Sequence, residues 1–250
     1  MRWRRESLRG SVFGGDGFGA PGLHWPGVMI DSLVPPTVVL VAAAALVSAR
    51  RKWLAAPPSR GVSVADVSVV LAIVTLAAVL ELAMGRTPVY QHGPVRLWSG
   101  NVHSDQNSQQ IADPYTLTHV SHGVALYALT RLALGPSRWW LRATVTVAIE
   151  SAWEVLENTD LVIERYRAQT ISLDYYGDSV LNSVCDVLAC LIGFGLAARL
   201  PTRVTIIGVV VVEAVLAFWI HDNLTLNVLM LIRPVDAVRR WQQVVVPSGG

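Results

Sequence analysis

The sequence predicts an all-α membrane protein, a bundle of about six transmembrane helices followed by a short re-entrant or interfacial helix near the C-terminus. Of the 250 residues, 52% are hydrophobic and only 15% are charged, and the mean hydropathy is +0.45. About a quarter of the residues of a soluble protein are charged, so this composition is typical of a membrane protein. Lipid offers the backbone no hydrogen-bond partners, and helices are therefore the expected state of the long apolar runs.

The first 28 residues differ from the rest of the chain, because they combine arginine with glycine and contain no sustained apolar run. No apolar signal-peptide core follows the arginines. We expect residues 1–28 to be disordered, or to be an extension ahead of a true start at Met29. Residues 29–250 are expected to form a single helical membrane domain.

Six apolar runs approach the roughly 20 residues that a helix needs to cross hydrocarbon. They are residues 33–47, 67–84, 115–134, 139–156, 180–200 and 204–220. The first begins with Pro35 and Pro36, which suit the opening turn of a helix. A seventh run, Leu224 to Ile232, is too short to cross alone and precedes the amphipathic PVDAVRRWQQ. This pattern favours a re-entrant or interfacial element.

The charge pattern argues against a nucleic-acid partner. The net charge is only +2, and the arginines are scattered along the chain. A nucleic-acid-binding surface would require a concentrated basic patch. The lipid bilayer is therefore the expected partner, and the sequence indicates no particular protein partner.

Three glutamates form a stripe within the segment IESAWEVLEN. Glu150, Glu154 and Glu157 are four and three residues apart, which on a helix places them within roughly 40° of one line. A carboxylate at the bilayer centre costs roughly 2.5 to 3.5 kcal/mol, whereas a leucine returns only about 0.5. The stripe is therefore expected to be sheltered inside the bundle. In the alternative interpretation only Glu150 is buried, and the other two lie at a solvated helix end.

A histidine pair opens the third apolar run, DPYTLTHVSHG. His119 and His122 are three residues apart and so share one helix face. Such a pair can bind a metal ion or relay protons. Alternatively, both rings form hydrogen bonds that only hold helices together.

The fifth run opens with a second polar ridge. Asp178, Asn182 and Asp186 follow a four-residue step, and the ridge continues through Ala189 and Gly193. These small residues would let another helix approach closely. Asp178 alone has a second interpretation, as the N-terminal cap of the helix.

A last polar group follows the sixth run, where the chain turns back: His221, Asp222, Asn223 and Asn227. We expect it to meet the polar ends of the third, fourth and fifth helices, which would create one buried polar site. The candidate site residues are therefore His119, His122, Glu150, Glu154, Glu157, Asp178, Asn182, Asp186, His221, Asp222 and Asn223.

The run from about Met84 to Trp241 resembles a family of uncharacterised multi-pass inner-membrane proteins of alphaproteobacteria. The segments that carry this resemblance are LWSGNVHSDQNSQQIADPYTLTHVSHG, IESAWEVLEN, RYRAQTISLDYYGDSVLNSVCDVLA and HDNLTLNVLMLIRP. The resemblance implies a multi-pass location in the cell inner membrane, and it implies no particular activity.

A fainter similarity is to the VanZ-like membrane module. That module has an acid and a histidine entering one helix and a D-x-x-x-N ahead of a glycine-containing helix. The matching residues are Asp113, His119, Asp178, Asn182 and Gly193. This similarity points to cell-envelope or lipid-linked chemistry.

Three functions fit these residues. In the first, His119 and His122 hold a divalent metal ion together with two of the acids Glu150, Glu154, Asp178 and Asp186, of which Glu154 is the first choice, and a remaining acid moves protons; the substrate is lipid-linked or part of the cell envelope. In the second, the same groups form the proton path of a proton-coupled transporter. In the third, the polar network only specifies how helices pack in a structural membrane module. No P-loop, H-E-x-x-H or nucleophile-elbow motif is present, so the sequence leaves open whether the chain is an enzyme.

Overall fold

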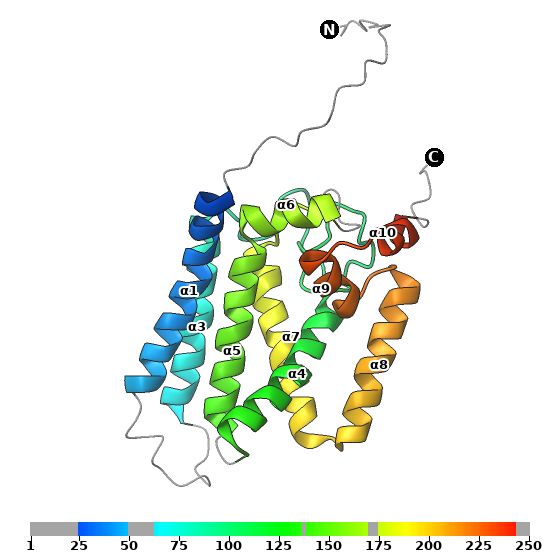
Figure 1. Cartoon of the computed structure of the whole chain (residues 1–250). Helices are drawn as coiled ribbons and strands as arrows, with labels where there is room; N and C mark the ends of the chain where they lie inside the picture. The colour runs from blue at the N-terminus through cyan, green and yellow to red at the C-terminus, as the bar shows by residue number, and fades with distance from the viewer. Residues whose placement is uncertain (1–24, 50–62, 137–138, 170–174, 244–250) are drawn as a thin grey trace, which may run out of the picture.

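The computed structural model describes residues 25–49, 63–136, 139–169 and 175–243, and the elements within them are helices. Among the described residues, six long helices stand side by side, and three short ones gather at one end of the bundle (Figure 1). The long helices are α1 (Trp25–Ala49), α3 (Val64–Ala83), α4 (Thr116–Leu134), α5 (Trp139–Glu157), α7 (Val180–Arg199) and α8 (Thr202–Trp219). The short ones are α6 (Asp160–Gln169), α9 (Leu224–Ile232) and α10 (Asp236–Gln243).

The all-helical fold agrees with the sequence prediction, and each of the six apolar runs lies on one long helix. Three of the described helices, α3, α7 and α8, are long and apolar enough to cross a membrane. Helix α1 contributes a shorter apolar stretch, Leu33–Ala45. Helices α4 and α5 carry more polar side chains, which face the interior. The number of six spans therefore stays a prediction.

The start of α1 differs from expectation. The helix begins at Trp25, ahead of Met29, and residues 1–24 of the expected extension lie outside the described residues. Pro35 and Pro36 consequently lie inside the helix. The prediction that they form its opening turn is wrong, because the helix has already begun upstream.

An apolar core joins α1, α3, α5 and α7. It is built from small and β-branched residues, which allow the four helices to pack closely. The most buried members are Val39, Ile73, Val147 and Val155, with exposed fractions of 0%, 1%, 0% and 0%. This core fixes α5, whose opposite face carries the glutamate stripe.

Helices α4 and α7 come into near backbone contact at two glycines. A Cβ atom on Gly123 would lie 1.9 Å from the carbonyl oxygen of Cys190, and one on Gly193 would lie 1.9 Å from the carbonyl oxygen of Val120. No side chain fits at either place. The close approach that the small-residue ridge predicted brings the histidines of α4 toward Asp186 of α7.

The chain reverses direction between α8 and α9, at a residue in the left-handed region, His221, with φ of 55°. Glu213 of α8 stabilises the reversal, because its Oε1 accepts a hydrogen bond from the Leu224 amide (3.1 Å) and its Oε2 accepts one from the Thr225 amide (3.0 Å). These amides belong to the first turn of α9, where a negative charge is favourable. Helix α9 thereby joins α6 and α10 at one end of the bundle (Figure 1).

The glycine contacts predict that even one added methyl group separates α4 from α7. Gly123→Ala and Gly193→Ala should each destabilise the protein by about 1 to 3 kcal/mol or more through overpacking. Gly208→Ala in α8 is the matched control, because no atom lies within 4 Å of its Cβ position. That change should be neutral or stabilising by up to about 1 kcal/mol. Thermal unfolding in detergent micelles measures all three, and equal midpoints for the three variants would contradict the close packing.

Candidate functional site

The centre of the site is one carboxylate oxygen between two imidazole rings. Glu150 Oε1 lies 2.7 Å from His119 Nδ1 and 2.9 Å from His122 Nδ1. His119 and His122 are one turn apart on α4, and Glu150 reaches them from α5. The Glu150 and His119 side chains are almost fully buried, with 2% and 8% exposed, whereas 18% of His122 is exposed. This contact holds α4 against α5 through buried polar groups.

These three residues meet the basic geometric requirement for a metal site. One ligand atom from each of His119, His122 and Glu150 lies within 4.8 Å of the other two. Two imidazoles and a carboxylate are a ligand set that suits first-row transition metals such as zinc, manganese or iron. The sequence named Glu154 as the carboxylate of this set, but Glu150 is the acid that contacts both rings.

Glu154 lies one turn further along α5, between the histidines and a second group of acids. Its Oε1 is 3.1 Å from His119 Nδ1, but that nitrogen lies closer to Glu150, and one ring nitrogen can serve only one strong hydrogen bond. Glu154 Oε1 therefore has no hydrogen-bond partner, although only 1% of the residue is exposed.

A second group of acids continues the site toward the end that carries α6. Glu154, Glu157 and Asp178 each offer a carboxylate oxygen within 4.8 Å of the other two. Glu157 is half-buried, so the whole stripe faces inward, with its last member at the edge. The alternative in which only Glu150 is buried is wrong, because Glu154 is equally enclosed.

Asp178 is fixed by Tyr175, three residues earlier, and by Asn158 at the end of α5. Its Oδ1 accepts a hydrogen bond from the Tyr175 hydroxyl (2.9 Å), and its Oδ2 accepts one from Asn158 Nδ2 (3.0 Å). Burial raises the pKa of Asp178 to about 6, although the hydrogen bond from Tyr175 acts in the opposite direction. Ser179, rather than Asp178, caps α7, because its hydroxyl accepts the Asn182 amide (3.2 Å).

The other two members of the α7 ridge have different roles. Asp186 faces the histidines, with Oδ2 3.9 Å from His119 Nε2, and its Oδ1 makes no hydrogen bond. Asn182 instead donates from Nδ2 to the Gln110 carbonyl (3.0 Å). Asn182 therefore holds the loop between α3 and α4 in place and does not face the site.

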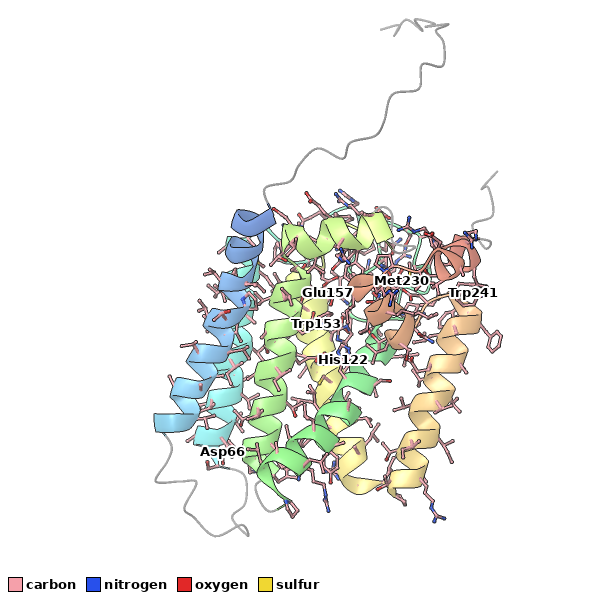
Figure 2. The ribbon with its side chains drawn as sticks, viewed as in Figure 1. Asp66, His122, Trp153, Glu157, Met230 and Trp241 are labelled. Carbon is pink, nitrogen blue, oxygen red and sulfur yellow. The ribbon has the colours of Figure 1, made fainter. Side chains whose placement is uncertain are left out.

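A cavity connects these groups to the end of the bundle. Its volume is about 40 Å³, counted as the space open to the centre of a water-sized sphere, and the cavity is partly open to the outside. In Figure 2, His122, Trp153 and Glu157 follow one another toward the end that carries α6 and α9, whereas Asp66 lies at the opposite end. The described residues that line it include no arginine or lysine: Asn107, Ser108, Tyr115, Thr118, His119, His122, Trp153, Glu157, Tyr166, Tyr175, Asp178, Asp186, Leu224, Asn227 and Val228.

The C-terminal polar group forms a separate network beside the cavity. Asp222 is fully buried and accepts hydrogen bonds from the Tyr115 hydroxyl (3.2 Å) and from Gln242 Nε2 (3.2 Å), which ties α10 to the start of α4. Asn223 caps α9, since its Oδ1 accepts the Leu226 amide (2.8 Å). Only Asn227 of this group lines the cavity, so His221, Asp222 and Asn223 support the site from outside.

Sequence reasoning missed Asn158, which is fully buried and joins α5 to the start of α7. Its Nδ2 donates to Asp178 Oδ2 (3.0 Å) and to the hydroxyl of Ser183 (3.3 Å), and its Oδ1 accepts the Asp178 amide (2.7 Å). A signal was present, because Asn158 follows Glu154 by four residues and so extends the polar stripe. Ser108 and Tyr166, also in the cavity wall, had no such spacing.

The fold and the site together define a bundle of apolar helices with a buried histidine–carboxylate site at one end. Residues 81–244 match a family described as "Protein of unknown function (DUF2585)", and the chain belongs to this family. The match covers the whole site. Helix α1 and nearly all of α3 lie ahead of it.

Curated relatives confirm the predicted family of alphaproteobacterial proteins. A UPF0314 protein of Paracoccus denitrificans is 51% identical over 170 residues, which are 68% of this chain and 88% of the relative. A UPF0314 protein of Sphingopyxis alaskensis is 43% identical over 182 residues, or 73% of this chain and 97% of the relative. No solved structure matches the chain. The fainter similarity to the VanZ-like module stays a prediction.

Asp222 predicts a pH dependence of stability. Burial raises its pKa from 3.8 to about 6, against the hydrogen bond from the Asn223 amide. Between about pH 4 and pH 6 the folded chain therefore binds more protons than the unfolded chain, so ionisation of Asp222 lowers stability as the pH rises. Asp222→Asn removes this contribution. The difference in the free energy of unfolding between the variant and the wild type should therefore shift in favour of the variant by up to about 3 kcal/mol as the pH rises from about 4 to about 7.

Unfolding in detergent micelles at the two pH values measures this difference. Asp160→Asn is the control for loss of a charge at the same end of the molecule, since 82% of the Asp160 side chain is exposed. If the Asp222→Asn variant keeps a constant offset from the wild type at both pH values, the assignment is wrong.

Proposed function

We propose that this chain is a multi-pass inner-membrane protein whose buried site binds a divalent metal ion and uses it in hydrolysis or group transfer on a lipid-linked or cell-envelope substrate. One observation carries the proposal: two imidazole nitrogens and a carboxylate oxygen converge from α4 and α5 beside a cavity that is open to the outside. A catalytic metal needs an open coordination position as well as ligands, and the cavity supplies that space.

The outer surface of α8 supports the membrane location. Its apolar side chains are exposed rather than packed against other described helices. An apolar surface of this extent is unfavourable in water and favourable in lipid. The exposed residues are Val204, Ile206, Ile207, Val210, Val211, Val215 and Phe218.

The lining of the cavity supports a substrate that is polar at one end and apolar at the other. Asn107, Ser108 and Asn227 offer hydrogen-bonding groups, whereas Leu224 and Val228 of α9 are apolar. Because the described lining has no arginine or lysine, an anionic group would have to be held by a bound cation. A metal ion would therefore bind and polarise the reacting group at the same place.

Asp186 is the best placed base for such a reaction, since its Oδ1 is buried, faces the cavity and makes no hydrogen bond. In a hydrolysis, a water molecule would give one proton to Asp186 while its oxygen forms a bond to the carbon or phosphorus of an ester. The ester bond to the alcohol then breaks, and the departing alcohol takes up the proton.

The proposal predicts about one transition-metal ion per purified chain. His119→Gln and His122→Gln each remove a ligand and should lower metal affinity by at least about 100-fold. Elemental analysis after dialysis of the detergent-solubilised protein against zinc or manganese measures the metal content. His103→Gln is the control, because His103 is exposed and lies in the loop outside the site.

A folded wild-type protein that takes up no metal would overturn the metal site. His122 is more exposed than His119, so His122→Gln remains informative if His119→Gln fails to fold. Thermal unfolding of each variant separates loss of a ligand from loss of structure.

Asp186→Asn separates chemistry from metal binding. The variant should retain the metal ion but lose activity, because the amide cannot take up the proton of water. In cells whose own family member is deleted, the wild type should restore the normal lipid profile and Asp186→Asn should not, although both accumulate in the membrane. Mass spectrometry of lipid extracts makes the comparison. Equal restoration by both proteins would favour the structural-module alternative, and an unchanged profile in the deletion strain would rule out a lipid-linked substrate.

A further inference from the structure

The three acids Glu154, Glu157 and Asp178 form a second group of possible ligands, next to the histidine site but built from different residues. Each offers a carboxylate oxygen within 4.8 Å of the other two. They come from two segments that are distant in sequence, the end of α5 and the start of α7. At such distances carboxylates either take up protons or bind a common cation, because three negative charges cannot stay together unneutralised in a buried place.

The protein supplies little positive charge to this group. No arginine or lysine lines the cavity among the described residues. Three arginines at this end of the bundle donate instead to main-chain carbonyls: Arg86 to Tyr176 (2.9 Å), Arg165 to Leu231 and Arg167 to Tyr175. Arg86 also pairs with Asp160 (3.0 Å). His119 and His122 are both occupied by Glu150. Apart from His119, whose Nδ1 lies 3.1 Å from Glu154 Oε1, the described residues thus offer these acids no cationic partner, which leaves room for a bound cation.

An unpartnered oxygen points independently to a ligand. Glu154 Oε1 is buried without a hydrogen-bond donor, in a residue that is only 1% exposed. Leaving a buried polar atom without a partner is costly, and native proteins usually satisfy such atoms with a protein group, water or an ion. Asp186 Oδ1, in a residue of the cavity wall, is also without a partner. The site thus has more acceptor oxygens than the described chain has donors for them.

Asp178, by contrast, is held in position. Tyr175 and Asn158 each donate to one of its two oxygens, and Asn158 also accepts the Asp178 amide. A ligand carboxylate is usually oriented by hydrogen bonds of this kind, which fix its direction before the ion arrives. The geometry of Asp178 therefore fits a preorganised ligand.

We infer that Glu154, Glu157 and Asp178 bind a second divalent cation, a hard ion such as magnesium, calcium or manganese, beside the metal ion of the histidine site. Carboxylate oxygens select hard cations, whereas the imidazoles of the first site select transition metals. The inference rests on the proposed function, because the second cation would complete a two-cation centre with the metal ion of the histidine site. Glu157 and Asp178 play no part in the histidine site. In such centres one ion activates the attacking oxygen and the other stabilises the leaving oxygen.

The test uses the full chain in detergent, stripped of metal with a chelator and then loaded with one equivalent of zinc. Titration calorimetry with magnesium, and electron paramagnetic resonance with manganese, should show one further ion per chain. Glu157→Gln and Asp178→Asn should weaken binding of the hard cation at least tenfold while zinc content stays unchanged. His122→Gln should have the reverse effect. Asp222→Asn is the matched control, since Asp222 is a buried acid outside the cavity.

Four outcomes are distinguishable. Zinc binding without any hard-cation binding would overturn this inference and leave the proposed function intact. Hard-cation binding that Glu157→Gln and Asp178→Asn leave unchanged would also overturn it. Hard-cation binding without zinc would support the acid site and refute the histidine site, and the absence of both ions in the folded chain would refute both. Glu157 is half-buried, so Glu157→Gln keeps the test valid if Asp178→Asn fails to fold.

Discussion

The structure depends on the contact between Glu150 of α5 and the two histidines of α4. An ionisable group in an apolar bundle is tolerated only where another polar group meets it, and here one carboxylate oxygen lies 2.7 Å and 2.9 Å from two ring nitrogens. The orientation of the other acids of the stripe follows from this contact, because Glu154 and Glu157 are on the same face of α5 as Glu150. Once Glu150 faces inward, they must do so too.

Backbone packing makes this contact possible. Gly123 and Gly193 let α4 and α7 approach so closely that no Cβ atom fits between them. Asp186 is thereby brought to 3.9 Å from His119. The loop residues, Asn158 and Tyr175, then place Asp178 at the open end. A well-packed apolar core on one face of α5 thus supports a polar chamber on the other, with fewer donors than acceptors in it.

Much of this arrangement could be predicted from residue spacing. The four- and three-residue steps of Glu150, Glu154 and Glu157 defined an inward face, and the small residues after Asp186 predicted a close helix contact. Spacing within one helix does not show which residue of another helix it meets, so Glu154 was named as the third ligand where Glu150 makes the contact. For the same reason Asp222, whose partners are Tyr115 and Gln242, could not be separated from the site. The place of Ser108 in the cavity wall depends on loop geometry, which has no periodic signal.

The claim that the buried histidine–carboxylate group is a metal centre is tested most directly by X-ray absorption spectroscopy at the edge of the bound metal. The account predicts a first shell with two imidazole nitrogens and at least one carboxylate oxygen at about 2.0 to 2.2 Å, and the loss of one imidazole in His122→Gln. A first shell of oxygen alone, unchanged by that substitution, would contradict it.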